Sequence, residues 1–253
     1  MDAALAKQHP FEYIHQIDLI LNILAVGAHP DDIEFGCGGT LAKWASKGCN
    51  IYHLVCTDGS KGTWDPNVDG IALAARRQQE QTLAARALGG TAPVTFLAWK
   101  DGELQSGLEQ RPQVVEAIRR LKPEIVLAHD PWKRYRLHPD HRHAGFLATD
   151  GVVAARDPLF FPHLGQPHRP AKMLLWEADQ PDHQEVIEEE FFQIKLRALK
   201  AHASQYESTM GVNQLDDESQ MEAFIQRLRA RLTENSLTSD GQLAEVFKLI
   251  PKI

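Results

Sequence analysis

Short apolar runs alternate with longer amphipathic stretches along most of the chain. The apolar runs predict strands at 17–27, 51–57, 94–99, 124–129 and 171–177, and the stretches between them predict helices at 38–48, 73–88 and 114–121. Farther on, the pattern predicts helices at 188–204 and 220–232 and a short edge strand at 244–250. Strands that alternate with helices indicate parallel βαβ units, so we expect an α/β fold with a doubly wound sheet.

The same pattern favours one domain over residues 1–253, because no internal repeat, low-complexity tract or linker interrupts it. Residues 1–16 show no clear period, and we expect them to form a short helix or arm. Residues from about 170 to 253 continue the domain as a C-terminal elaboration.

The composition is that of a soluble enzyme, with 43% hydrophobic and 24% charged residues in 253. A net charge of -7 and a pI near 5.9 do not indicate binding to nucleic acid or to an anionic membrane, which usually requires clustered positive charge. Four basic residues gather at Lys133, Arg134, Arg136 and Arg142, which suits a small ligand or a subunit contact. No secretory or membrane-spanning segment is evident, so we expect a cytoplasmic protein.

The three cysteines, Cys37, Cys49 and Cys56, are odd in number and lack a CxxC spacing. Neither a disulfide framework nor a thiolate zinc knuckle is therefore indicated. We expect buried, reduced thiols, and for Cys37, close to an acidic cluster, the role of a small core residue is favoured.

Ionisable residues follow two of the predicted strands. The first cluster is His29-Pro-Asp-Asp32, and the second, after a short loop, is His138-Pro-Asp-His141. Ligands of doubly wound folds bind beyond the carboxyl ends of the strands, so sheet topology can bring the two clusters together. The loop at Asp58, Asp101 and the His129-Asp130 segment also follow strands and are expected at the same edge. A catalytic zinc takes three nitrogen or oxygen ligands and leaves one position open, and the two clusters supply such a set with groups to spare. The spare groups suit metal-assisted hydrolysis, which needs a base for water and a donor for the oxyanion. The spacing alone does not decide which of the two aspartates binds metal and which is the base.

Two other interpretations of the first cluster are open. It could be a helix N-cap with an incidental histidine, since aspartate is favoured at that position. The glycines at 36, 38 and 39 after a strand also suggest a dinucleotide fold, but the GxGxxG spacing fails at Leu41 and an acidic turn would repel pyrophosphate.

Taken together, several motifs resemble the PIG-L/LmbE family of zinc-dependent de-N-acetylases. They are Ala28-His-Pro-Asp-Asp32 with Gly38-Gly39-Thr40, Thr57-Asp58-Gly59 with Gly62-Thr63, Arg77-x-x-Glu80 and His138-Pro-Asp-His141. The resemblance extends from about Ile23 to Gln205 and is greatest to the diacetylchitobiose deacetylase type. It implies a Rossmann-like α/β fold, with a mostly parallel sheet and helices on both faces, and removal of acetyl from an N-acetylglucosamine unit.

The resemblance also assigns roles to residues. His29, Asp32 and His141 match the zinc ligands, and Asp31 matches the general base. His138 matches an imidazolium that stabilises the tetrahedral oxyanion, and Asp140 the residue that orients it.

Substrate contacts are expected at four further positions. By the resemblance, Arg77 and Asp101 contact sugar hydroxyls; otherwise Arg77 is a surface residue paired with Glu80 or Glu103, and Asp101 belongs to a turn. Trp132 and Tyr135, with Trp64, could stack on sugar faces, unless Trp132 packs under its loop. His143 and His202 are expected to be structural or to support the ligands, and His53 to be a hydrogen-bonded core residue.

The expected activity is therefore zinc-dependent hydrolysis of the acetamide of N-acetylglucosamine or diacetylchitobiose, by a homo-oligomer such as a trimer or hexamer. The residues before His138 depart from the thiol-pathway deacetylases, because Arg136 and Leu137 stand where those enzymes carry an aromatic hydroxyl. Other N-acyl substrates, such as a thiol-pathway sugar conjugate or a secondary metabolite, remain alternatives. So do a nucleotide-binding module and a catalytically silent protein with a structural metal.

Overall fold

A computed structural model describes residues 21–90, 92–213, 218–238 and 241–253. Its centre is a seven-stranded sheet in the order β3-β2-β1-β4-β5-β7-β6. The strands are β1 Asn22–Gly27, β2 Asn50–Thr57, β3 Thr95–Trp99, β4 Ile125–His129, β5 Lys172–Trp176, β6 His183–Val186 and β7 Ala244–Ile250. The first five strands are parallel, while β7 runs antiparallel to both β5 and β6. The predicted α/β class with a mostly parallel sheet is confirmed.

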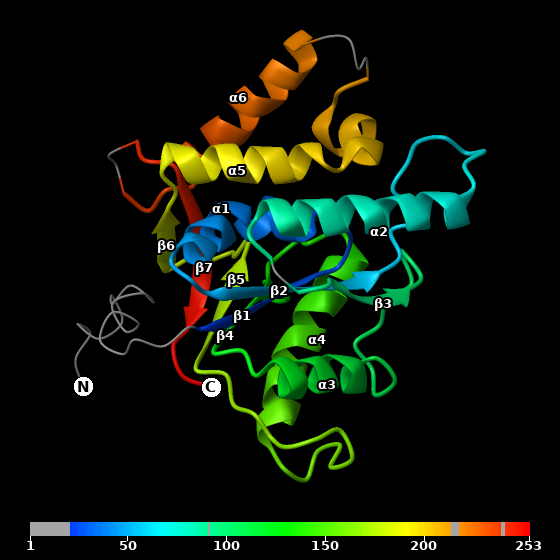
Figure 1. Cartoon of the computed structure of the whole chain (residues 1–253), viewed down its shortest axis with the longest axis vertical. Coiled ribbons are helices and arrows are strands. Elements are labelled where there is room, and N and C mark those ends of the chain that lie inside the picture. Colours follow the sequence, from blue (N-terminus) through cyan, green and yellow to red (C-terminus); the bar gives the residue numbers. More distant parts are fainter. Residues whose placement is uncertain (1–20, 91, 214–217, 239–240) are drawn as a thin grey trace.

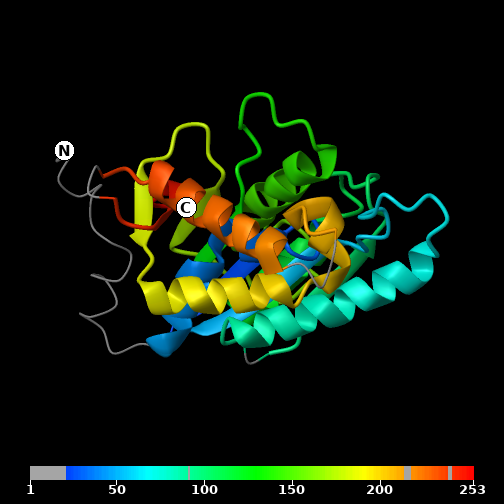
Figure 2. The same cartoon turned by 90° about the horizontal axis from the view of Figure 1, so that it is seen from above.

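Helices cover both faces of this sheet (Figure 1). On one face lie α1 Asp32–Ser46, α2 Gly70–Ala87, α5 Glu189–Lys200 and α6 Glu218–Glu234; on the other lie α3 Arg111–Leu121 and α4 Pro139–Arg156. The view from above shows α2 and α5 side by side (Figure 2). No helix among the described residues is long and apolar enough to cross a membrane.

Side chains of β1 alternate between two cores, which explains the continuous apolar run. Ile23 and Ala25 join the core under α1 and α5, whereas Leu24 and Val26 join the core under α3 and α4. A parallel strand that is buried on both faces reads as continuously hydrophobic.

The structure corrects several predicted boundaries. The strand at 17–27 begins at Asn22 among the described residues, and the predicted arm at 1–16 lies outside them. β7 is not an edge strand, because β6, which the sequence pattern did not predict, pairs with its outer side. The helix predicted at 188–204 ends at Lys200 and is followed by a short 3₁₀ turn, Ala203–Gln205, and a π turn, Tyr206–Met210.

Helix α1 starts at Asp32 rather than at residue 38, and it is kinked at Cys37, where φ is -150°. A buried pair from other elements satisfies the backbone at this kink. Glu245 of β7 accepts hydrogen bonds from the N–H groups of Gly39 and Thr40, and Lys195 of α5 donates to the carbonyl of Phe35 and binds Glu245. Glycine lowers helix propensity, but Gly36 and Gly39 are needed for packing here, because a Cβ atom would lie 2.6 Å from Trp176 at the first position and 2.8 Å from Ile187 at the second.

Candidate metal and catalytic site

The two ionisable clusters meet at the carboxyl edge of the sheet. His29 and Asp31 lie between the end of β1 and the start of α1, and Asp32 is the first residue of α1. His138 is the N-cap residue of α4, and His141 lies in the first turn of that helix. They share a cavity of about 340 Å³, lined by His29, Asp31, Asp32, Lys61, Gly62, Arg77, Asp101, Gly102, His138, His141, Gln205 and Thr209. Sheet topology thus brings together residues that are more than a hundred positions apart.

Three side chains form a compact set of candidate metal ligands, namely His29, Asp32 and His141, whose ligand atoms lie within 4.8 Å of one another. Nδ1 of His29 is 3.2 Å from Oδ2 of Asp32, and Nε2 of His141 is 3.2 Å from Oδ1 of Asp32. This set fits a divalent cation, because the other nitrogen of His29 is already engaged: Nε2 lies 3.2 Å from carboxylate oxygens of Asp101 and Asp140. A histidine that gives one nitrogen to a carboxylate and keeps the other for metal is the usual arrangement around a bound ion.

The charges around these ligands also suit a cation. Burial opposes protonation of His29, but hydrogen bonds to Asp101, Asp140 and Asp32 outweigh it and raise the pKa of His29 well above its usual value. Burial likewise opposes ionisation of Asp32, but His141 and His129 hold the pKa of Asp32 well below its usual value. A metal ion would take the place of the proton on His29, so its binding should release protons.

Asp31 occupies a different position from Asp32. Its carboxylate lies 3.5 Å from Nη2 of Arg77. Its backbone has φ 100° and ψ -24°, a conformation that is rare for residues other than glycine. Burial raises the pKa of Asp31 to about 6, although the charge of Arg77 works in the opposite direction. A buried carboxyl with a raised pKa beside a cavity has the character of a proton acceptor.

His138 is exposed at the cavity and stacks against His141, with ring centroids 4.7 Å apart. Burial and the neighbouring His29 and His141 lower the pKa of His138, which favours a neutral ring that can still donate one N–H. Asp140 makes its contacts elsewhere: it accepts from the backbone N–H groups of Gly102 and Leu104 and lies beside His29. In this structure Asp140 therefore orients His29.

Two further residues belong to the site. His129 was expected at this edge of the sheet but was given no role there, and Glu177 was not predicted. Nε2 of His129, at the end of β4, lies 3.2 Å from Oδ2 of Asp32. Glu177, which directly follows β5, accepts from Arg136 at 2.6 Å, and Arg136 in turn lies 3.3 Å from Nδ1 of His141. Two other groups have the spacing of metal ligands. His29, Asp101 and His138 share His29 with the first set, and His129, His141 and Glu177 lie where the guanidinium of Arg136 already supplies positive charge. The position of His129 at a strand end was a usable signal, whereas nothing in the sequence pointed to Glu177.

Arg77 and Asp101 both line the cavity and are buried. Arg77 is not the paired surface residue of the alternative interpretation: its guanidinium donates to the carbonyls of Pro30 at 2.5 Å and of Gly59 at 2.9 Å. Asp101 accepts from the N–H of Lys61 and faces His29. Both side chains are therefore held in place before any ligand arrives.

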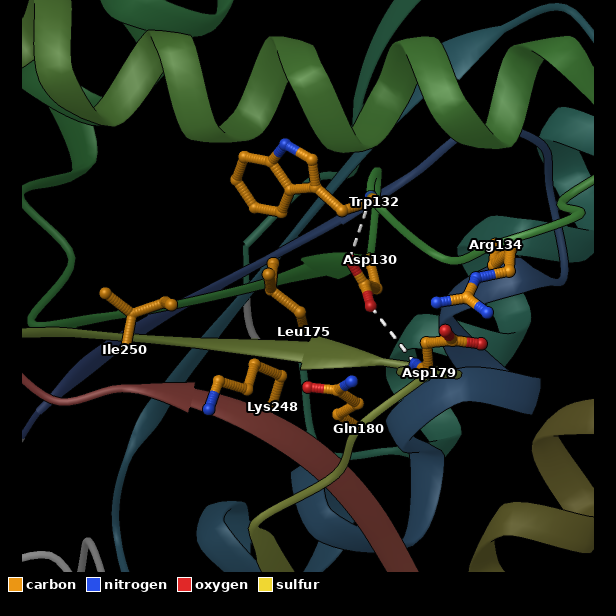
Figure 3. A pocket seen from close by; sticks show the side chains of 8 residues that line it. All are labelled: Asp130, Trp132, Arg134, Leu175, Asp179, Gln180, Lys248 and Ile250. Atoms are coloured by element: carbon orange, nitrogen blue, oxygen red, sulfur yellow. Dashed lines mark hydrogen bonds between the residues drawn. The ribbon is translucent and has the colours of Figure 1, made fainter.

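The aromatic residues proposed to stack on sugars lie away from this cavity. Trp132 is 61% exposed, packs edge-on against Phe146 and lines a second cavity of about 430 Å³ with Asp130, Arg134, Leu175, Asp179, Gln180, Lys248 and Ile250 (Figure 3). Tyr135 is 86% exposed and lines neither cavity. The structure does not bring either ring to the candidate metal site.

The remaining residues singled out in the sequence are distributed around the site. Trp64 is exposed, His143 contacts Ser106 at 3.1 Å, and His202 lies 3.4 Å from Glu34. His53 is buried, but neither of its ring nitrogens hydrogen-bonds to a described residue. The prediction of a hydrogen-bonded core histidine is therefore wrong.

The cysteines and two of the four clustered basic residues have structural surroundings. The cysteines Cys37, Cys49 and Cys56 are free and buried, as expected. Of the four basic residues, Arg136 is buried against Glu177, and Arg142 donates to the backbone carbonyls of Arg136 and Leu137.

The fold and the site define an α/β protein with a mostly parallel Rossmann-like sheet and a candidate cation site of histidines and carboxylates at its carboxyl edge. The chain belongs to the PIG-L family: the family model described as GlcNAc-PI de-N-acetylase matches residues 24–152. The chain is therefore a hydrolase of the deacetylase kind, and its resemblance to this family is confirmed.

Individual relatives agree with this assignment. The chain is 36% identical to diacetylchitobiose deacetylase of Thermococcus kodakarensis over 209 residues, which cover 81% of this chain and 77% of the relative. Its structure is similar to that of N,N'-diacetylchitobiose deacetylase from Pyrococcus horikoshii, with a TM-score of 0.83, 27% identity and coverage of 98% and 89%. The fold is also that of the 4-carboxy-2-hydroxymuconate hydratase GalB from Pseudomonas putida, with a TM-score of 0.72, 20% identity and coverage of 92% and 98%. Since the fold accommodates a hydratase too, the reaction must be argued from the site.

Proposed function

We propose that the protein hydrolyses the acetamide of an N-acetylglucosamine-containing sugar, with zinc as its metal, and releases acetate and a free amino sugar. The observation that carries the proposal is the different surroundings of two adjacent carboxylates at the end of β1: Asp32 contacts three histidines, whereas Asp31 lines the cavity beside Arg77. A metal that only stabilised the fold would not require a buried proton acceptor next to it.

In this proposal His29, Asp32 and His141 hold one divalent cation. When bound, the cation polarises the acetamide carbonyl and lowers the pKa of a water molecule. Other divalent metals also suit two imidazoles and a carboxylate, so zinc is inferred from the family.

The chain's own residues would then move the protons. The carboxylate of Asp31 accepts the proton of the attacking water, and in its protonated form it returns a proton to the leaving amine. An N–H of His138, at the mouth of the cavity, donates to the oxyanion of the tetrahedral intermediate. Asp140 supports this arrangement through His29.

The cavity itself favours a hydrophilic ligand. Carboxylate, guanidinium and amide groups of Asp101, Arg77 and Gln205 line it, and its volume of about 340 Å³ matches the lower range of small-molecule sites. Arg77 and Asp101 are the proposed contacts for sugar hydroxyls, and Trp132 and Tyr135 could contact only a longer substrate that extends beyond the cavity. Assembly into a trimer or hexamer and a location in the cytoplasm stay predictions.

Acetate release tests the proposal. The zinc-loaded protein is incubated with N-acetylglucosamine, diacetylchitobiose and an N-acetylglucosaminyl-inositol, with an N-acylated cysteinyl sugar as the competing amide and 4-carboxy-2-hydroxymuconate as the hydratase substrate. Acetate and free amine in equal amounts from at least one of the first three sugars would support the proposal. Turnover of only one of the last two compounds would contradict it.

A further inference from the structure

The backbone of Asp31 is held in a conformation that an aspartate seldom adopts, with φ 100° and ψ -24°. The conformation has a visible consequence. Asp32 contacts His129 and His141, whereas Asp31, one residue earlier, contacts Arg77. A non-glycine residue keeps such a conformation only when its surroundings fix it.

Two residues of α2 fix it by holding one peptide unit at both ends. The carbonyl oxygen of the Pro30–Asp31 peptide accepts from Nη2 of Arg77 at 2.5 Å, and the N–H of the same peptide donates to Oε1 of Gln81 at 2.9 Å. Arg77 and Gln81 are four residues apart, so they project from the same face of the helix.

A hydrogen bond to Glu34 sets the orientation of the Gln81 amide. Its Nε2 donates to Oε1 of Glu34 at 2.7 Å, so its oxygen must face the N–H of Asp31. Glu34 is itself fixed, with Oε2 lying 3.4 Å from Nε2 of His202. Gln81 and Glu34 are both completely buried, which makes an unpaired amide at this position costly.

We propose that Gln81 is a positioning residue of the reaction: it clamps the N–H of Asp31 so that the carboxylate stays over the cavity while Asp32 remains free for metal. This inference rests on the proposed function, in which Asp31 is the base. The hydrogen bonds of the Gln81 side chain run to Asp31 and Glu34 and not to His29, Asp32 or His141.

The test is the variant Gln81→Leu, which removes the hydrogen bonds of Gln81 to Asp31 and Glu34 at nearly constant volume and leaves the bond from Arg77 to the Pro30 carbonyl. A displacement of about 1 Å at a catalytic group can cost about 100-fold in rate, so we expect kcat to fall about 10- to 100-fold while zinc affinity changes by less than about threefold. The double variant Gln81→Glu/Glu34→Gln exchanges donor and acceptor between the two side chains, so it keeps an acceptor for the N–H of Asp31 without bringing two buried carboxylates together, and it should recover most of kcat. Gln79→Leu, on the exposed side of α2, is the matched control and should behave as wild type.

Two results would overturn the inference: an unchanged kcat in folded Gln81→Leu, or a parallel loss of zinc and activity. If Gln81→Leu does not fold, Gln81→Asn shortens the amide by one methylene and should show the same selective loss of kcat; full activity in that variant would also overturn it. Asp31→Asn is assayed alongside. If that variant keeps wild-type turnover the proposed function fails, whereas if it is inactive with zinc bound and Gln81→Leu is fully active, only the inference on Gln81 fails.

Discussion

The indole N–H of Trp176 donates a hydrogen bond to Nδ1 of His129, with 2.9 Å between the two nitrogens. Because Nδ1 accepts, the proton of a neutral His129 must sit on Nε2, which lies 3.2 Å from Oδ2 of Asp32. Burial opposes a charged ring, but Asp32 and Glu177 outweigh it and raise the pKa of His129. A protonated ring would lose the hydrogen bond from Trp176, so the neutral ring is the state in which His129 presents its N–H to Asp32 and orients that carboxylate at the candidate metal site.

Replacing His129 should therefore weaken metal binding without touching the ligands themselves. Loss of such a supporting group typically costs about 10- to 100-fold in metal affinity. We expect that range for His129→Phe and a smaller loss for Trp176→Phe, measured by competition for zinc with a chromophoric chelator. His163→Phe, at an exposed histidine, is the control. Wild-type zinc affinity in His129→Phe would show that Asp32 needs no such support.

Much of this site could be predicted from the sequence because its residues stand at strand ends. The two clusters around His29 and His141 follow strands with clear apolar runs, and parallel strands of one sheet end at the same edge. The resemblance then separated Asp31 from Asp32, which spacing alone could not do. The structure adds the physical reason, which is the positive φ of Asp31.

Other features left no local signal. Glu177 has φ 53° directly after β5, and its partners Arg136 and Arg231 come from distant segments, so only the tertiary structure brings them together. The strand β6 is short and polar, HQEV, and was missed because its pattern resembles a loop. Trp132 is of a residue type that often stacks on sugars, but its loop places it at the second cavity and not at the candidate metal site.

The buried pair of Lys195 and Glu245 should matter for stability rather than for catalysis. Both side chains are fully or almost fully buried, and Glu245 also accepts from two backbone N–H groups at the kink of α1. Breaking one side of a buried pair typically costs about 3–5 kcal/mol. We therefore expect Glu245→Ala to lower the free energy of unfolding by about that amount in urea denaturation.

An exposed pair provides the matched control for this prediction. Arg229 binds Glu189 on the surface at 2.8 Å, and exposed ion pairs contribute at most about 1 kcal/mol. If Glu189→Ala lowered the free energy of unfolding as much as Glu245→Ala does, burial of the Lys195–Glu245 pair at the kink of α1 would not be the cause of its effect.

The pH dependence of turnover should report on Asp31. Burial raises the pKa of Asp31 to about 6 in the metal-free protein, against the effect of Arg77. A base accepts a proton only when it is ionised, so activity should be lost as the pH falls through this pKa. A bound cation adds positive charge and lowers the value, so the acid limb of the kcat profile should have its midpoint at or below about 6.

A substitution at Arg77 tests the same assignment. Arg77→Gln removes the positive charge beside Asp31 and should move the acid limb to higher pH, whereas Arg77→Lys keeps the charge and should move it less. An acid limb that is identical in all three proteins would mean that another group controls the reaction.

If the two adjacent aspartates have separate tasks, their variants must separate metal binding from turnover. Bound zinc and acetate release should therefore be measured on the same preparations of wild type, Asp31→Asn and Asp32→Asn. We predict that Asp31→Asn keeps one zinc ion per chain and loses about 100- to 10,000-fold in kcat, the usual contribution of a general base. Asp32→Asn should lose both zinc and activity. Wild-type turnover in zinc-loaded Asp31→Asn, or full zinc occupancy in Asp32→Asn, would contradict the account.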